Sequence, residues 1–205
     1  AHPDQLEKFF QKYSFDVVYV QSIENLFNDS KTGWLYVISP RVWEDEKSGG
    51  RGRLFFVVRE VSKGKFQPHL LMSAWGFTTD MSYVFDISDH NQNGKPEIAL
   101  FHGYQSGSMC GGSLLIYEWK EKEFIELTEG NISLRECADD FEYSQNENSP
   151  SIVVSKVFPV HIKELYSWNG KFYEFAGFVD ASALTEWQFS LFDPSFSYAE
   201  ETELI

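Results

Sequence analysis

The chain has 205 residues, 31 of them acidic and 17 basic, which gives a formal net charge of −14. Its content of 42% hydrophobic and 17% aromatic residues argues against a disordered chain and predicts the packed core of one domain. The acidic balance argues against a nucleic-acid partner, because affinity for phosphates comes mainly from Lys and Arg, and no apolar run is long enough for a membrane-spanning helix.

Helix-forming patterns are confined to the N-terminal end. Residues 3–13 begin with a proline and carry apolar side chains at helical spacing, which predicts one short amphipathic helix. The runs 15–20 and 34–38 are rich in β-branched and aromatic residues and are bounded by turn-forming residues, so we expect strands there. The polar, glycine-rich segment 44–52 predicts a loop.

A hairpin pattern recurs at blade-like intervals, around residues 53–71, 83–127 and 152–176. Each copy contains runs of strand-forming residues joined by a turn, and helical periodicity nearly vanishes after residue 13. We therefore predict a single domain over residues 1–205. Its class is all-β and mainly antiparallel, with β-propeller-like or stacked-blade repeats and a short N-terminal helix.

The second and third copies share an aromatic signature. Tyr117 and Trp119 in the second copy match Tyr166 and Trp168 in the third, and each pair precedes a turn and a phenylalanine. Residues two apart in a strand point to the same face, so each pair should cover one face of its hairpin.

The segment 89–97 carries the one pattern that predicts chemistry, because oxygen-bearing side chains occupy alternate positions in it. Calcium prefers six to eight oxygen ligands, and a glycine lets such a loop curl tightly enough to direct them at one centre. The predicted ligands are the side chains of Asp89, Asn91, Asn93 and Glu97 and the carbonyl of Lys95. The alternative is a turn rich in Asn and Asp that holds no ion.

An EF-hand does not fit this spacing. Its twelfth position, which requires a bidentate Glu, is Leu100 here, and a strand-like run with a proline follows in place of a helix. The D-x-N-x-N-G-x-x-E spacing, followed by an apolar strand and the Tyr-x-Trp hairpin, instead resembles the calcium loop of FG-GAP (integrin-α-type and related VCBS) β-propeller repeats. The resemblance covers residues 83–127 and, in part, 153–175. It implies a blade with a structural calcium ion, although the loop occurs only once.

Two carboxylates among the predicted ligands favour a weak structural site that fills at extracellular calcium, about 10⁻⁴–10⁻³ M. Such a site predicts a secreted, periplasmic or cell-surface protein. Cys110 and Cys137 are then expected to form a disulfide, whereas two buried thiols are the alternative. His90 lies inside the loop but alternates away from the ligands, so we expect it to face solvent.

Known catalytic signatures are missing from the sequence. The glycine-rich segment 106–112 lacks the lysine of a phosphate loop and the GxSxG pattern, and predicts a flexible loop. The pair of Cys110 and His102 lacks a recognisable orienting group, so a thiol nucleophile is not favoured. We lean against an enzyme, although carboxylate pairs of hydrolases leave no fixed spacing in a sequence.

Three functional hypotheses remain. The favoured one is a non-enzymatic secreted or cell-envelope β-repeat domain with one structural calcium loop, acting as a protein-interaction or binding module. The second is a glycan-binding module that uses exposed aromatic rings, with Trp43 and Trp187 as candidates. The third is a hydrolase. Segment 128–150 is expected to be a long mobile loop and 198–205 a frayed tail.

Overall fold

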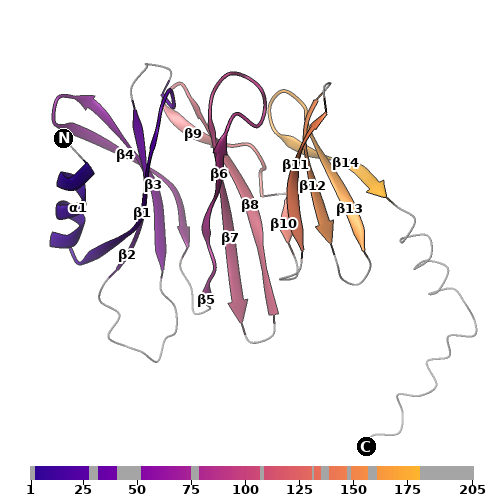
Figure 1. Ribbon diagram of the computed structural model, residues 1–205, viewed down its shortest axis with the longest axis horizontal. Helices are drawn as coiled ribbons and strands as arrows, with labels where there is room; N and C mark the ends of the chain where they lie inside the picture. Colours follow the sequence, from indigo (N-terminus) through magenta and orange to yellow (C-terminus); the bar gives the residue numbers. More distant parts are fainter. Residues whose placement is uncertain are drawn as a thin grey trace, which may run out of the picture.

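The computed structural model shows three antiparallel sheets that follow one another in chain order along the long axis of the molecule, with a helix at the N-terminal end (Figure 1). It describes residues 3–27, 32–40, 52–74, 79–106, 109–130, 132–134, 139–146, 149–156 and 161–180. Cys137, Trp43, Trp187 and the tail 198–205 lie outside the described residues. The prediction of a mainly antiparallel all-β fold with one short helix is confirmed.

Helix α1 (Pro3–Lys12) agrees with the predicted amphipathic segment. Its proline stands at the first turn, where the missing N–H is not needed for helical hydrogen bonding. The ring of Phe10 packs against Tyr36 and Phe56 of the first sheet, with centroids 5.5 and 5.2 Å apart. The helix therefore covers part of the outer face of that sheet.

The first sheet has four strands in the order β1-β2-β3-β4, each antiparallel to its neighbour. They are β1 (Phe15–Ile23), β2 (Gly33–Pro40), β3 (Arg53–Ser62) and β4 (Lys65–Ala74). The two strands predicted at 15–20 and 34–38 are β1 and β2.

The middle sheet has six strands and places β7 and β8 at its centre. Its strands are β5 (Thr79–Asp80), β6 (Tyr83–Ser88), β7 (Glu97–Ser106), β8 (Met109–Lys120), β9 (Glu123–Glu126) and β10 (Ser133–Leu134). The third sheet has the order β11-β12-β13-β14. Its strands are β11 (Asp140–Asn146), β12 (Ser149–Lys156), β13 (Ile162–Trp168) and β14 (Tyr173–Asp180).

The middle sheet is buried on both faces, because alternate residues of one strand enter two different cores. On β7, Ile98 and Leu100 join a core with Leu35 and Phe55 of the first sheet. Ala99 and Phe101 belong to a second core, which includes residues of the third sheet. Because side chains alternate between the two faces of a strand, every second residue of β7 faces the third sheet.

Two expected loops contain strands. The segment 128–150, predicted as a long mobile loop, includes β10, β11 and the start of β12. The reason is that aromatic rings of β11 pack inward, and the ring centroids of Phe141 and Phe85 lie 4.2 Å apart. In the predicted loop 106–112, β8 begins at Met109. Gly112 is required there by close packing, since a Cβ would collide with the carbonyl of His102 and the ring of Phe101. Within the described ranges, no helix combines the length and apolar character needed to cross a membrane.

Candidate functional site

The loop between β6 and β7 is held closed at its base, where Ser88 and Glu97 are paired partners in the antiparallel ladder. Inside the loop, Gln92 and Gly94 adopt positive φ angles of 59° and 86°. Gly94 meets this requirement without the steric cost that a side chain imposes, which is why a glycine suits the turn. The loop therefore curls tightly, as the spacing predicts.

Side-chain oxygens fold the loop around itself. The two carboxylate oxygens of Asp89 accept hydrogen bonds from the backbone N–H groups of Asn93 (2.9 Å) and Gly94 (2.8 Å). Asn91 Oδ1 accepts from the N–H of Asn93 (3.1 Å), and Asn93 Oδ1 accepts from the N–H of Lys95 (2.9 Å). Each of these oxygens has two lone pairs, so one hydrogen bond leaves acceptor capacity for a further partner.

Glu97 is the buried carboxylate of the loop, with no exposed surface. Its Oε2 accepts from the N–H groups of His90 (2.6 Å) and Asn91 (3.3 Å), whereas its buried Oε1 has no hydrogen-bond partner among the described residues. Burial raises the pKa of Glu97 to about 7, against the lowering effect of the two backbone donors. The nearby charges of Glu118 and Asp89 raise this pKa further.

Glu118 is a member of the site that the sequence analysis missed. It lies on β8 with 2% exposure, and its carboxylate accepts hydrogen bonds from Nδ2 of Asn91 (3.3 Å) and of Asn93 (3.1 Å). Lys120 Nζ is 3.4 Å from its Oε2. The available signal was a charged residue inside a buried aromatic strand, between Tyr117 and Trp119. Only the packing of β8 beside the loop reveals its partners.

The third sheet supplies the far wall of the site. Alternation on β7 puts Glu97 on the same face as Ala99 and Phe101, which is the face of the core that the third sheet completes. From that sheet, the hydroxyl oxygens of Tyr143 and Tyr173 are buried without a hydrogen-bond partner among the described residues. Burial raises the pKa of both phenols, and the Glu97 carboxylate raises them further.

His90 does not face solvent, contrary to the expectation from alternation. Its side chain is 4% exposed, and its ring stacks on Tyr143 with centroids 3.7 Å apart. Burial lowers the pKa of His90 to about 4, although the charges of Asp86 and Asp89 act in the opposite direction. The alternation argument was wrong because it treated the loop as isolated, whereas the third sheet covers this side of it.

The predicted convergence of Asp89, Asn91, Asn93, the Lys95 carbonyl and Glu97 on one cation stays a prediction. Across the described ranges, no group of three His, Cys, Asp or Glu side chains is arranged to hold a metal ion. In the structure the side-chain oxygens of the predicted ligands accept hydrogen bonds from backbone N–H groups of the loop. The third carboxylate of the site, Glu118, comes from another strand.

Comparison of the chain with protein-family models, curated proteins and solved structures found no match. The resemblance to FG-GAP repeats therefore depends on the residues of the 83–127 segment itself. Of the other predicted sites, Cys110 is disulfide-bonded, and Cys137 falls outside the described residues. The aromatic candidates Trp43 and Trp187 also fall outside them.

Proposed function

We propose that the protein is a non-enzymatic binding module in which one calcium ion at the 89–97 loop stabilises the junction between the middle and third sheets. The observation that carries the proposal is Glu97, a fully buried carboxylate with one oxygen that has no hydrogen-bond partner among the described residues. Two further carboxylates, Asp89 and Glu118, are near enough for their charges to raise its pKa. Buried carboxylates without compensation cost several kcal/mol each. A bound cation would remove that cost.

The donor set favours calcium over other common metal ions. Every candidate ligand is an oxygen, from carboxylates, side-chain amides and a backbone carbonyl, which suits a hard cation. Zinc and other borderline ions prefer nitrogen and sulfur, and magnesium demands a compact octahedral shell and releases water reluctantly. A loop that mixes several oxygen types with flexible geometry matches the requirements of calcium best.

Glu118 supports the proposal by orienting the two asparagines. Because Nδ2 of Asn91 and Nδ2 of Asn93 both donate to Glu118, the Oδ1 atoms of both side chains are kept on the loop side. These are the atoms that the sequence predicts as ligands. The Glu118 carboxylate also adds a third negative charge to the site. Lys120 pairs with the Glu118 carboxylate and so compensates one of the three charges. We assign Glu118 an orienting and electrostatic role in cation binding.

The proposed consequence of binding is structural. The ring of His90 stacks on Tyr143, and the charge of Glu97 acts on the Tyr143 phenol, so an ion that fixes the loop would also fix the contact with the third sheet. A weak site would be filled in a secreted, periplasmic or cell-surface setting, where calcium is abundant. The interaction partner of the module is not specified by this site.

The carboxylate pair at the 89–97 loop does not favour the hydrolase alternative. Glu97 and Glu118 are the close carboxylates of the site, but they are 0% and 2% exposed. Carboxylate pairs of glycosidases flank a bond of a bound substrate and therefore line an open cleft. A buried pair cannot act in that way.

The decisive experiment is a calcium titration of the metal-depleted full chain, followed by thermal unfolding and calorimetry. We expect one site with a Kd of about 10⁻⁴–10⁻³ M and a melting temperature that rises with calcium. Magnesium at the same concentration serves as the control and should have little effect. An unchanged melting curve at a calcium concentration of about 10 mM would show that the loop is only a turn.

A further inference from the structure

The outer face of the first sheet is only partly covered by α1. Phe10 of the helix packs on Tyr36 and Phe56, but Trp34 lies two residues before Tyr36 on the same face of β2. The ladder pairs Trp34 with Val58 of β3, so Glu60 is a diagonal neighbour of Trp34 on that face. Side chains at diagonal positions are within reach of each other.

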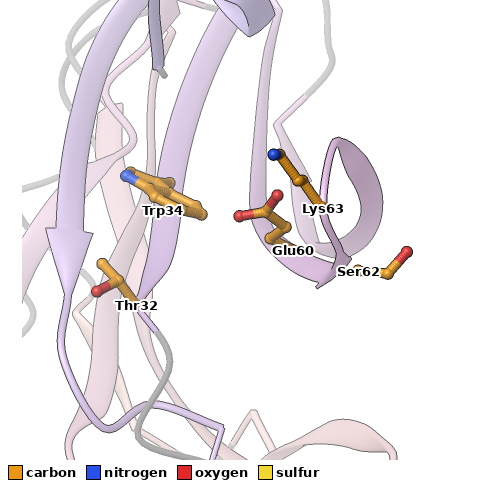
Figure 2. Close-up of a pocket in the computed structure, with 5 residues that line it drawn as sticks. All are labelled: Thr32, Trp34, Glu60, Ser62 and Lys63. Carbon is orange, nitrogen blue, oxygen red and sulfur yellow. The ribbon is translucent and has the colours of Figure 1, made fainter. Parts of the chain in front are cut away.

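A pocket of about 460 Å³ lies at this part of the sheet, within the roughly 300–1,000 Å³ typical of small-molecule sites. Its described lining consists of Thr32, Trp34, Glu60, Ser62 and Lys63. Figure 2 shows the side chains of Glu60 and Lys63 extending toward the side on which the indole ring of Trp34 lies.

The two principal side chains of the pocket are held in place. Glu60 Oε1 accepts a hydrogen bond from the backbone N–H of Gly64 (2.7 Å), which ties the carboxylate to the β3–β4 turn. The edge of Phe66 packs against Trp34 with centroids 6.5 Å apart. Trp34 is half-buried and lines the pocket.

We propose that this pocket binds a neutral sugar ring. The indole face of Trp34 offers an apolar platform for the C–H groups of a pyranose, and Glu60 accepts hydrogen bonds from its hydroxyl groups. Lys63 donates from the same side of the pocket as Glu60. One aromatic face bordered by donors and acceptors is complementary to a molecule that has an apolar face and a ring of hydroxyls.

Charged ligands fit the same pocket less well. A quaternary ammonium ion would be attracted by Trp34 and Glu60, but Lys63 repels it and a single ring is not an aromatic cage. An acidic sugar would be repelled by Glu60 and by the net charge of −14. The pocket lies on the first sheet, whereas the 89–97 loop adjoins the third, so this proposal does not depend on calcium binding.

The test is a titration of the calcium-saturated full chain with glucose, galactose, mannose and N-acetylglucosamine and their short oligomers. Binding to wild type is followed through the indole N–H resonance of Trp34, which is assigned with Trp34→Phe, and the affinity of wild type and of every variant is measured by isothermal titration calorimetry. We expect at least one neutral sugar to shift the Trp34 resonance, while choline and glucuronate bind at least about tenfold more weakly. Trp34→Ala should weaken sugar binding at least about tenfold, and Trp34→Phe less, because it keeps an aromatic face.

Two further variants separate binding from folding. Glu60→Gln retains an acceptor for Gly64 and should weaken binding without changing the circular dichroism. Tyr104→Ala removes a ring that is 48% exposed on the middle sheet and should leave the affinity unchanged. The proposal is overturned if no neutral sugar shifts the Trp34 resonance, if Trp34→Ala binds as wild type does, or if choline binds more tightly than every sugar.

Discussion

The ring of His90 lies nearly parallel to the phenol ring of Tyr143, with 3.7 Å between centroids and 13° between planes. His90 lies in the loop that precedes β7 of the middle sheet, whereas Tyr143 is on β11 of the third sheet. The stack therefore joins the candidate cation loop to the third sheet directly. Binding of an ion to the loop, or protonation of His90, should therefore change the stability of the third sheet.

The first prediction concerns acid sensitivity at His90. Its folded pKa of about 4 lies below the ordinary value of 6.5, so the unfolded chain binds more protons between these values. The contribution of His90 to the free energy of unfolding is complete above pH 6.5 and falls by up to about 3 kcal/mol as the pH drops to 4. His90→Phe keeps a ring on Tyr143 and removes the proton, so its stability should fall less over this range. Urea unfolding at a series of pH values measures the difference, and equal slopes for both proteins would contradict the prediction.

Glu97 should show the opposite pH dependence. Its folded pKa of about 7 lies above the ordinary value of 4.5, so its contribution to stability falls as the pH rises from 4.5 to 7. In calcium-free solution at pH 8, Glu97→Gln should therefore be more stable than wild type, by up to about 3 kcal/mol. The amide retains an acceptor for the N–H of His90 and adds a donor where Oε1 has no partner in the part of the chain that the structure describes.

The control for Glu97 is Glu123→Gln, which changes an exposed carboxylate and should leave stability within about 0.5 kcal/mol of wild type at each pH. A Glu97→Gln variant that is less stable than wild type at pH 8 without calcium would show that the carboxylate is already compensated in the apo protein.

Calcium binding should depend on carboxylates from two separate segments. At a hundredfold excess over Kd, calcium should stabilise wild type by about 2.7 kcal/mol. Asp89→Asn and Glu97→Gln should each abolish most of this gain, because each removes one of the loop carboxylates. Glu118→Gln should weaken calcium binding about tenfold or more. It removes one negative charge, and it no longer offers two acceptor oxygens that hold the side-chain amides of Asn91 and Asn93 in one orientation. Melting curves with and without calcium measure these gains.

The matched control for Glu118 is Glu121→Gln, three residues further along the chain and exposed in the β8–β9 turn. It should keep the full calcium response. If Glu118→Gln and Glu121→Gln respond equally to calcium, Glu118 has no part in the site.

Gly112 tests the close packing of β7 against β8. A Cβ at this position meets the carbonyl oxygen of His102, which cannot move without disturbing the ladder, and the ring of Phe101. Gly112→Ala should therefore destabilise the protein by about 1–3 kcal/mol. At Gly103 the three nearest atoms all belong to the side chain of Phe101 and none to the backbone, so Gly103→Ala should cost less. Chemical unfolding of the two variants compares these costs, and an equal or reversed order would contradict the explanation.

Local pattern determined the secondary structure of most of the chain. The proline-led segment at the N-terminus predicted α1, and runs of β-branched and aromatic residues predicted β1 and β2, because backbone preference and period-two alternation are read from neighbours in the sequence. The same holds for the curled turn at 89–97, where the hydrogen bonds of Asp89 and Asn91 join residues only a few positions apart. The strand β11 was missed because its inward aromatic rings, Phe141 and Tyr143, are interspersed with polar residues typical of loops.

Only the tertiary structure decided which side chains meet. Glu118 follows Asn91 by 27 positions and still accepts a hydrogen bond from it, and His90 is buried because Tyr143 of another sheet covers it. Trp34 of β2 lines a pocket together with Glu60 of β3 and Lys63 of the turn that follows it. The physical reason is that burial and electrostatic environment are properties of packed sheets, which depend on contacts between segments far apart in the chain. A sequence pattern describes a strand or a loop and leaves its neighbours undetermined.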